Sequence, residues 1–309
     1  MNFGEGFRRF RRSSPPAATD GAADRGWALV SVLWVVAILS MLAAASEQLT
    51  VTTVRTEHKA QDAARAGADL DAGVARAVMG LGDPVLSQRW RIDGVAQDFS
   101  FDGMKISVAV QDELGRIDLN NADVSMLRQL LQAAGGMQPQ DATALADKIV
   151  DWRGLADRHS LHGATDADYA AAGLSYRQRH GPYQTAEEVK LVLGMTPRIY
   201  ARIAPALTVY SHHPSFDAGT APREALMALY FNNPAEADQV MAERQRGTGL
   251  TSGNQNAVPQ GILGPSASLG GRAFAVDASL TLNGKRFTRH AVIETTGDDK
   301  RPYFVLAWK

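Results

Sequence analysis

The sequence predicts an α+β protein in which a long N-terminal helix packs on an antiparallel sheet and a large all-α domain is inserted into that sheet. An uncharged apolar run at residues 27–46 continues into a proline-free amphipathic segment that ends at Leu81. Strand-like alternation occurs at residues 99–110 and again at 274–308, and the stretch between them has helical spacing. Because strands lie on both sides of the helical stretch, we expect one sheet with a helical insertion.

The composition of the chain excludes several kinds of functional site. The chain has 309 residues, of which 45% are hydrophobic, so it is long enough for an anchor helix and one or two domains. It contains no cysteine, which excludes disulfides, thiolate catalysis and cysteine-based zinc sites. The formal charge of -1 offers no overall basic excess to attract nucleic acid.

Residues 1–26 form a basic, arginine-rich leader that contains Pro15-Pro16. Such a segment buries little apolar surface, so we expect it to be disordered, and its positive charge places it on the cytoplasmic side of a membrane. Residues 27–46 would form a helix of about 30 Å, which matches a bilayer core and predicts a transmembrane helix. The chain after about Glu47 would then lie outside the cytoplasm.

Two other interpretations of the apolar run stay open. One is a plain signal anchor. The other is a secretory signal peptide cut after Ala43-Ala44-Ala45, where small residues stand at suitable positions. The run is longer than the apolar core of a usual signal peptide, which weighs against this second alternative.

Residues 47–112 are predicted to contain the rest of the long helix and the first strands. Gly82-Asp83-Pro84 ends the helix, and residues 99–110 are predicted to be one strand. Four apolar residues recur at the spacing of one helical face: Leu70, Val74, Val78 and Leu81.

Residues 113–215 are predicted to form the inserted α-domain. One helix covers 127–134 and ends at Gly135-Gly136, and the next covers 145–152 and ends at Gly154. Thr185 and Glu188 have the spacing of a capping box, which predicts a third helix before Gly194. Thr196-Pro197 opens a fourth helix, which continues through residue 203.

Residues 216–309 are predicted to hold a second helical unit, a mobile loop at 247–271 and the closing strands. The motif at 117–122, with Arg153 downstream, is similar to the motif at 216–221, with Arg244 downstream, and so indicates a weak internal repeat. Residues 247–271 are rich in Gly, Ser, Asn and Pro. Asn283-Gly284 predicts a tight hairpin, and a last strand covers 303–308.

Arg25-Gly26-Trp27 resembles a type IV prepilin signal, in which a prepilin peptidase cuts after the glycine and leaves the apolar helix on the mature protein. This resemblance implies cleavage between Gly26 and Trp27, with Trp27 as the mature N-terminus. The order of the motifs that follow resembles the minor pseudopilin K family of type II secretion systems, also called general secretion pathway protein K. The resemblance rests on residues 111–122, 146–153, 185–195, 200–209, 220–226 and 303–308.

The resemblance implies a pseudopilin fold and a non-enzymatic role in protein export. It implies a single-pass inner-membrane protein whose C-terminal part lies in the periplasm. It also implies a place at the tip of the pseudopilus, above the major pseudopilin and together with the minor pseudopilins I, J and H. Secreted substrates and the outer-membrane secretin would be further partners.

Ser31 stands at the fifth position after the expected cleavage site, where most pseudopilins have a glutamate that pairs with the N-terminal amine of a neighbouring subunit. A buried carboxylate is costly unless a positive partner meets it. Since the topmost subunit has no subunit above it, the absent charge favours a tip position. The alternative is that Ser31 is simply tolerated in a transmembrane helix.

The resemblance also implies calcium in the α-domain. The loop after Trp152 contains Asp157, Asp166 and Asp168, and Asp151 stands just before it. Calcium prefers six to eight oxygen ligands, mostly carboxylates and carbonyls. Arg153 and Arg158 lie in the same loop and would repel a cation. A solvated acidic loop without an ion is therefore the alternative.

Two other site classes are weaker. His159 and His162, and His212-His213, do not bring together the four ligands that zinc needs. No hydrolase elbow, phosphate-binding loop or zinc-protease motif occurs, so nothing indicates an enzyme. Residues 118–131 and 189–203 also resemble competence-type helix-hairpin-helix DNA-binding modules, with Gly194-Met195-Thr196 at the hairpin. Acidic and basic residues nearly balance at 113–210, which argues against DNA.

Overall fold

The computed structural model describes residues 23–83, 85, 88–155, 160–231, 233–246, 270–298 and 300–309, with side chains described except at 23–26 and 44–58. The chain forms two compact units, Met1–Asp62 and Ala63–Lys309. The leader residues 1–22 and most of the predicted loop, 247–269, lie outside the described residues.

The first unit contains the N-terminal part of α1 (Ala23–Leu81). Large apolar side chains stay exposed along it, from Trp27 to Leu42. The sequence analysis placed the start of the helix at Trp27, but α1 already begins at Ala23. A single glycine such as Gly26 costs a helix only about 1 kcal/mol relative to alanine and does not stop it. Among the described residues, no helix combines the length and hydropathy that a membrane crossing requires. The end of the expected span, residues 44–46, lies outside the described side chains.

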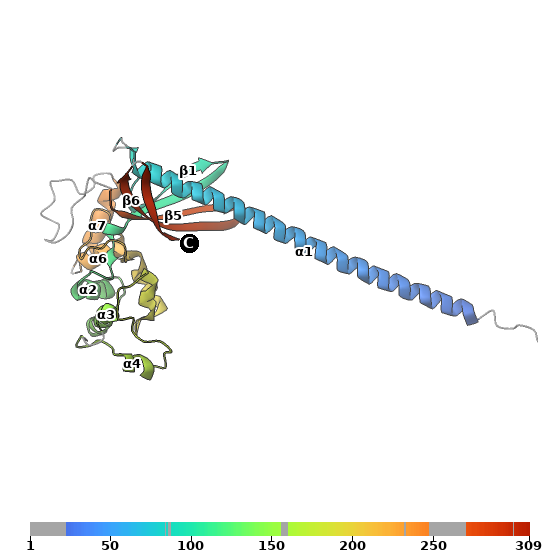
Figure 1. The fold of residues 1–309 in the computed structure, drawn as a ribbon, viewed down its shortest axis with the longest axis horizontal. Coiled ribbons are helices and arrows are strands. Elements are labelled where there is room, and N and C mark those ends of the chain that lie inside the picture. The colour runs from blue at the N-terminus through green and yellow to red at the C-terminus, as the bar shows by residue number, and fades with distance from the viewer. Residues whose placement is uncertain are drawn as a thin grey trace, which may run out of the picture. The chain divides into compact units, whose positions relative to one another are not determined.

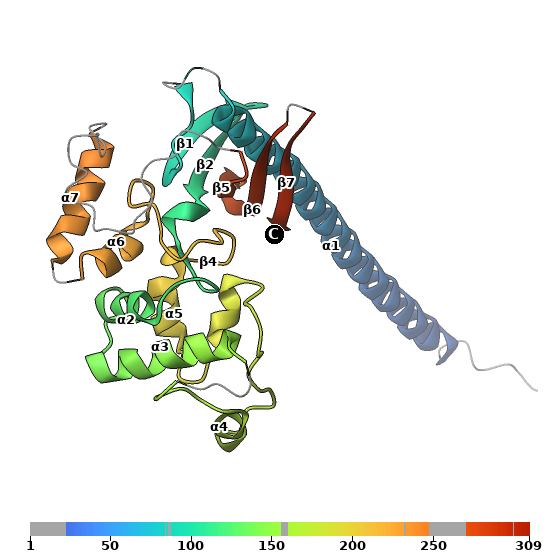
Figure 2. The same ribbon diagram turned by 60° about the vertical axis from the view of Figure 1, so that its left-hand side comes forward.

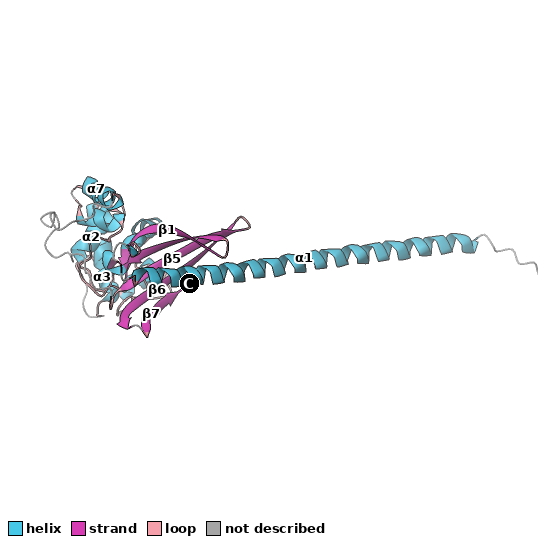
Figure 3. Ribbon diagram, turned by 90° about the horizontal axis from the view of Figure 1, so that it is seen from above, coloured by secondary structure: helices cyan, strands magenta, loops and turns pink. Residues whose placement is uncertain are grey.

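The second unit is built on a five-stranded antiparallel sheet in the order β1-β2-β5-β6-β7. The strands are β1 (Asp93–Phe101), β2 (Met104–Asp112), β5 (Ala273–Leu282), β6 (Lys285–Asp298) and β7 (Arg301–Trp308). Figures 1 and 3 show the end of α1 lying along one face of this sheet. Leu70 and Val74 of the helix pack there with Ile106 and Val108 of β2 and Val276 of β5. The predicted apolar stripe of the helix is thus confirmed, and α1 ends where Gly82-Asp83-Pro84 was expected to end it.

The predicted strand at 99–110 is wrong in one respect, because the chain turns back within it. Asp102 and Gly103 adopt φ angles of +46° and +74°, and this tight turn joins β1 to β2. Asp-Gly is a strong hairpin signal, and the apolar alternation on both sides of it had masked the turn. The Asn283-Gly284 hairpin between β5 and β6 is confirmed, with φ angles of +51° and +75°.

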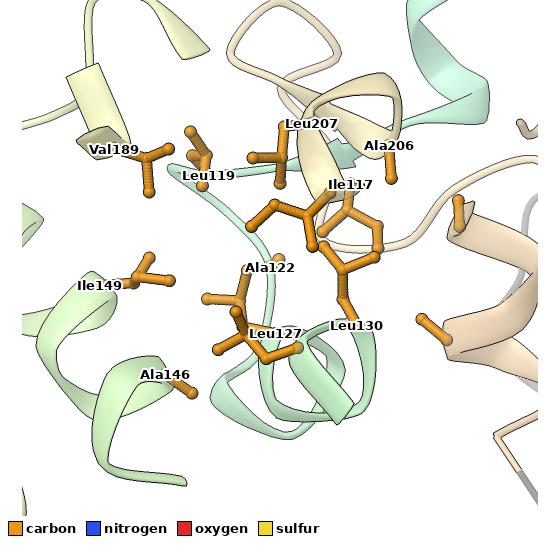
Figure 4. Packing of buried hydrophobic residues seen from close by; sticks show 14 of the residues in the cluster. Ile117, Leu119, Ala122, Leu127, Leu130, Ala146, Ile149, Val189, Ala206 and Leu207 are labelled. Carbon is orange, nitrogen blue, oxygen red and sulfur yellow. The ribbon is translucent and has the colours of Figure 1, made fainter. Parts of the chain in front are cut away.

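The helical insertion leaves the sheet after β2 and returns at β5, as predicted. Its elements are η2 (Glu113–Gly115), β3 (Ile117–Asp118), α2 (Val124–Ala133), α3 (Pro139–Arg153), α4 (Asp166–Ala171), η3 (Ala186–Leu191), α5 (Pro197–Ile203), η4 (Ala204–Ala206), β4 (Leu207–Thr208), α6 (Arg223–Leu229) and α7 (Pro234–Gln245). Figure 2 shows these helices gathered beyond the end of β2. They share one apolar core, and Figure 4 shows Leu127 and Ile149 facing Leu119 and Leu207 within it. Because this core also contains Leu226 of α6, the boundary expected at residue 215 falls inside one packed domain.

The predicted capping box at Thr185 does not form. The side chain of Thr185 makes no cap hydrogen bond, and the segment after it is the 3-10 helix η3 rather than an α-helix. Glu188 instead accepts hydrogen bonds from Trp152 Nε1 at 3.2 Å and from Arg179 Nη1 at 2.9 Å. The other carboxylate oxygen, Oε2, accepts from the amide of Gln184 at 2.9 Å, so Glu188 serves one local and two more distant donors rather than the amide of Thr185.

The internal repeat is present in the structure. Asp118 accepts a hydrogen bond from the amide two residues ahead, and Asp217 does the same, each at 2.7 Å. Arg153, the last residue of α3, donates to the carbonyls of Leu119 and Ala122. Arg244 of α7 donates to the equivalent carbonyls, those of Ala218 and Ala221. Each unit is thus a turn and a pair of helices closed by one arginine, which we call the arginine clamp.

Candidate functional site

The fibre-core position lies on α1. Trp27 is 82% exposed, and Ser31 is exposed on the same helix. The hydroxyl of Ser31 donates to the carbonyl of Ala28 at 2.9 Å, a bond that a serine makes within its own helix. No charge needs a partner at this position. Gly26 belongs to α1, but the structure does not test the cleavage site.

The carboxylates proposed for calcium are placed on three different local features. Asp151 is buried at the end of α3 and accepts hydrogen bonds from the amide and the hydroxyl of Ser160, at 3.0 and 2.7 Å. Asp166 lies 3.0 Å from Nε2 of His180. Asp168 forms a capping box with Thr165 at the start of α4. Asp157 lies outside the described residues.

The positions of these carboxylates show how many ligands they could offer to a calcium ion. Within the ranges that the structure describes, no group of three or more acidic or histidine side chains is placed to hold a metal ion. Calcium requires six to eight oxygens around one point. Asp151, Asp166 and Asp168 alone do not provide this, and calcium binding stays a prediction that depends on Asp157 and on backbone carbonyls.

The loop around α4 is held by an aromatic cluster that the sequence analysis did not identify. Trp152 packs against the rings of Tyr169, Tyr176 and Tyr183, at centroid distances of 5.8 to 6.4 Å. The hydroxyl of Tyr183 donates to the carbonyl of Ile149, and burial raises the pKa of Tyr183 well above its usual value. The ring therefore stays neutral and serves as a core residue. Tyr169, which ends the acidic segment, is fully buried and fixes α4 to this core.

The attachment of the α-domain to the sheet is polar and buried. Asp112, at the end of β2, pairs with Arg272, which directly precedes β5. Asp112 also accepts a hydrogen bond from the amide of Leu114 at 2.9 Å, and the Gln111 side chain donates to the carbonyl of Thr220 at 2.8 Å. The two points where the chain enters and leaves the domain are thus joined by one ion pair.

The helix-hairpin-helix alternative finds no support at its hairpin. Gly194 has a φ angle of +94°, so the chain does turn there. However, the side chain of Thr196 accepts from the amide of Ile199 at 3.2 Å, which occupies a donor that a phosphate would need. Glu187 and Glu188 lie in the neighbouring η3 and add negative charge beside the turn.

A model of the family "Type II secretion system (T2SS), protein K" matches residues 108–212, from β2 into the α-domain. The "Type II secretion system protein K" of Klebsiella pneumoniae is 25% identical over 245 residues, covering 72% of this chain and 74% of that protein. Together these matches support a protein K of a type II secretion system. They support a minor pseudopilin of type II secretion, which is an envelope-associated component.

The fold agrees with this assignment. The crystal structure of the GspK-GspI-GspJ complex from the type 2 secretion system of enterotoxigenic Escherichia coli contains a chain that matches this protein with a TM-score of 0.61. The match covers 83% of this chain and 98% of that chain, at 18% identity. At this identity the likeness concerns the fold. It includes the mixture of a long helix, a sheet and helices that the sequence predicted.

Proposed function

We propose that this protein is a non-enzymatic, membrane-anchored minor pseudopilin that caps the tip of the pseudopilus. The observation that carries the proposal is the α-domain inserted between β2 and β5. A domain of this size beside a pilin sheet would clash sterically with a subunit stacked above it. The exposed apolar side chains between Trp27 and Leu42 support anchoring in a bilayer first and packing in a fibre core afterwards.

The proposed partners are other pseudopilins. The related Escherichia coli chain was solved with GspI and GspJ. We assign minor pseudopilins I and J as neighbours of this protein, and extend the set to pseudopilin H, the major pseudopilin and prepilin peptidase. Contact with secreted substrates and with the outer-membrane secretin is part of the same proposal.

The test removes the α-domain while it keeps the sheet. Asp112 of β2 pairs with Phe274 of β5, so the two strand ends are neighbours and a short turn can replace residues 113–271. The trimmed subunit is expected to enter the shaft of assembled fibres, as mapped by site-specific crosslinking to the major pseudopilin. The full-length protein in the same cells is the control. Trimmed subunits found only at tips would overturn the steric argument.

Ser31 gives a second test of the tip assignment. Ser31→Glu introduces the carboxylate that internal subunits carry, so we expect incorporation within the shaft and weaker initiation of fibres. Ser40, whose hydroxyl donates to the carbonyl of Val36 at 2.7 Å, is the matched control, because Ser40→Glu adds the same charge elsewhere on α1. Equal behaviour of the two variants would show that position 31 has no special meaning.

The N-terminus of the mature protein tests processing and topology together. Cleavage by prepilin peptidase would leave Trp27 as the first residue. A mature chain that starts at Ser46 or Glu47 would contradict the proposal, because it would indicate signal-peptide removal after the small residues at 43–45.

Calcium in the α-domain is kept as a proposal with its own test. A cation that binds only the folded state raises stability by about 2.7 kcal/mol at a hundred times its dissociation constant. The melting temperature of the protein with millimolar calcium is therefore expected to exceed that with chelator. Equal melting temperatures would remove calcium from the proposal.

A further inference from the structure

A cavity of about 210 Å³ lies where the α-domain meets the sheet. Its walls come from η2, η3, α5 and the segment around β4 on one side, and from β5, β6 and the residues at the end of β7 on the other. Glu113 and His290 are the titratable groups considered below. The remaining charged or titratable groups that line the cavity are Arg116, Glu187, Tyr200, Tyr210, Asp277 and Lys309.

Glu113 is the unusual member of this set. Its side chain is 1% exposed, and Oε1 accepts a hydrogen bond from Arg116 Nη1 at 2.9 Å. Within the described part of the chain, Oε2 is buried and accepts no hydrogen bond of ordinary geometry. An ionised carboxylate with one unsatisfied oxygen is costly in such a place. Burial accordingly raises the pKa of Glu113 above its usual value, although Arg116, a hydrogen bond from the side chain of Thr208 and the charge of His290 oppose the shift.

His290 lies on the sheet side of the same cavity. Its Nδ1 is 2.7 Å from Oδ1 of Asp277, and this hydrogen bond raises the pKa of His290 above its usual value. The backbone of His290 pairs with that of Lys309, whose Nζ reaches Glu187 Oε1 of η3 at 2.6 Å. The sheet and the α-domain are therefore connected across the cavity by a surface ion pair, next to two groups that take up protons on folding.

We propose that this joint is tightened in mild acid and loosened as the solution becomes alkaline, with Glu113 and His290 as its two titrating groups. Opening the joint would bring water to Oε2 of Glu113, so ionisation of Glu113 favours the open form. Loss of the proton from His290 removes a positive charge that faces both Asp277 and Glu113. Both changes act in the same direction, and together they would make the seating of the α-domain on the sheet depend on pH.

The sign follows from linkage. A group whose folded-state pKa is raised contributes stability that is complete below its unfolded pKa and is lost as the pH rises through the folded value. Both Glu113 and His290 are of this kind. Glu187 is opposite: burial pushes its pKa upward, but the hydrogen bond from Lys309 helps to hold it below its usual value. The joint is therefore tightest in mild acid, where Glu187 is still ionised, and it loosens as the pH rises through the folded-state pKa values of Glu113 and His290.

Hydrogen exchange on the full-length protein in detergent tests this proposal. The amide of Leu119, which donates to Thr208, and the amide of Lys309, which donates to His290, report on the two sides of the joint. After correction for intrinsic exchange, the opening constant at these amides is expected to rise between pH 5.5 and 8.5. The rise is on the order of tenfold for each unit by which a folded pKa exceeds its unfolded value. Amides where β2 pairs with β5 serve as the internal reference.

Three variants distinguish a pH-dependent joint from a general loss of stability. Glu113→Gln keeps the shape and removes the charge, so the part of the loosening that Glu113 contributes is expected to disappear and only the part due to His290 to remain. His290→Gln is expected to remove the part of the pH profile near neutrality. His213→Gln replaces an exposed histidine and is expected to leave the profile unchanged. A flat profile in the wild-type protein, or equal flattening by His213→Gln, would overturn the proposal. If Glu113→Gln does not fold, the wild-type and His290→Gln profiles still decide it.

Discussion

Replacing the arginine of either clamp with lysine is expected to destabilise the α-domain. In each clamp, the planar guanidinium donates to two backbone carbonyls separated by three residues: Arg153 to Leu119 and Ala122, and Arg244 to the carbonyls of Ala218 and Ala221. The ammonium group of lysine can keep the positive charge and one of these hydrogen bonds. It cannot donate to both carbonyls as the planar guanidinium does. We therefore expect the loss of one charge-assisted hydrogen bond, about 1.5–3 kcal/mol of unfolding free energy.

The methionine variants set the upper limit of this effect. Arg153→Met and Arg244→Met lose both hydrogen bonds and leave two carbonyls without their donors. Burial lowers the pKa of both arginines, which shows that desolvation of the charge offsets part of the gain. The expected cost of each methionine variant is therefore less than twice that of the lysine variant, about 2–5 kcal/mol.

Urea unfolding followed by tryptophan fluorescence measures these differences, since Trp152 is buried in the α-domain core. Arg198, which is exposed on α5, provides the control: Arg198→Lys is expected to change stability by less than about 0.5 kcal/mol. If Arg153→Lys and Arg244→Lys were as stable as Arg198→Lys, the fork geometry would be unimportant and the clamp interpretation would be refuted. Similar costs at the two clamps would support their equivalence as repeat positions.

Two further substitutions test the attachment and the α4 loop. Arg272→Met leaves the carboxylate of Asp112 buried without its partner and is expected to cost about 3–5 kcal/mol in urea unfolding, with part recovered when Asp112→Asn is added. Gly163→Ala would place a Cβ 1.6 Å from Oδ2 of Asp151, so it is expected to displace that carboxylate and to cost about 1–3 kcal/mol. Gly181→Ala meets no atom within 4 Å and should be neutral in the same assay.

The parts of the fold that the sequence predicted are those set by local backbone chemistry. α1 ends at Leu81, just before Gly82-Asp83-Pro84, because a proline disfavours the helical conformation in the residue before it, and Asn283-Gly284 adopts the positive φ angles of a tight hairpin. The repeat was also visible in sequence, because similar turn motifs at 117–122 and 216–221 are each followed by helical spacing and then an arginine, Arg153 or Arg244. Their function, to close each turn through two carbonyls, needed the structure.

The missed β1-β2 turn has a local cause, since apolar alternation masked Asp102-Gly103, whereas the missing capping box results from competition by partners distant in the sequence. Glu188 has the spacing of a capping box, but Trp152 and Arg179 bind its carboxylate, and η3 forms instead of an α-helix. Asp151 and Asp166, two of the residues expected to bind calcium, also have partners in Ser160 and His180, and calcium binding stays a prediction. A side chain that can serve two partners is assigned by the tertiary fold, and spacing alone cannot rank those partners.

The second repeat unit explains why the α-domain cannot end at residue 215. Gly115, in η2, approaches Thr220 so closely that a Cβ would lie 2.8 Å from its backbone carbonyl, and the amide of Asp217 donates to the carbonyl of Leu114 at 2.7 Å. The second repeat unit thus contacts the segment through which the chain enters the α-domain. It also covers the buried face of α2, because Leu127 and Leu226 belong to one core. A domain cut at residue 215 would expose this face and lose its attachment, so the deletion that tests tip capping has to remove both units together.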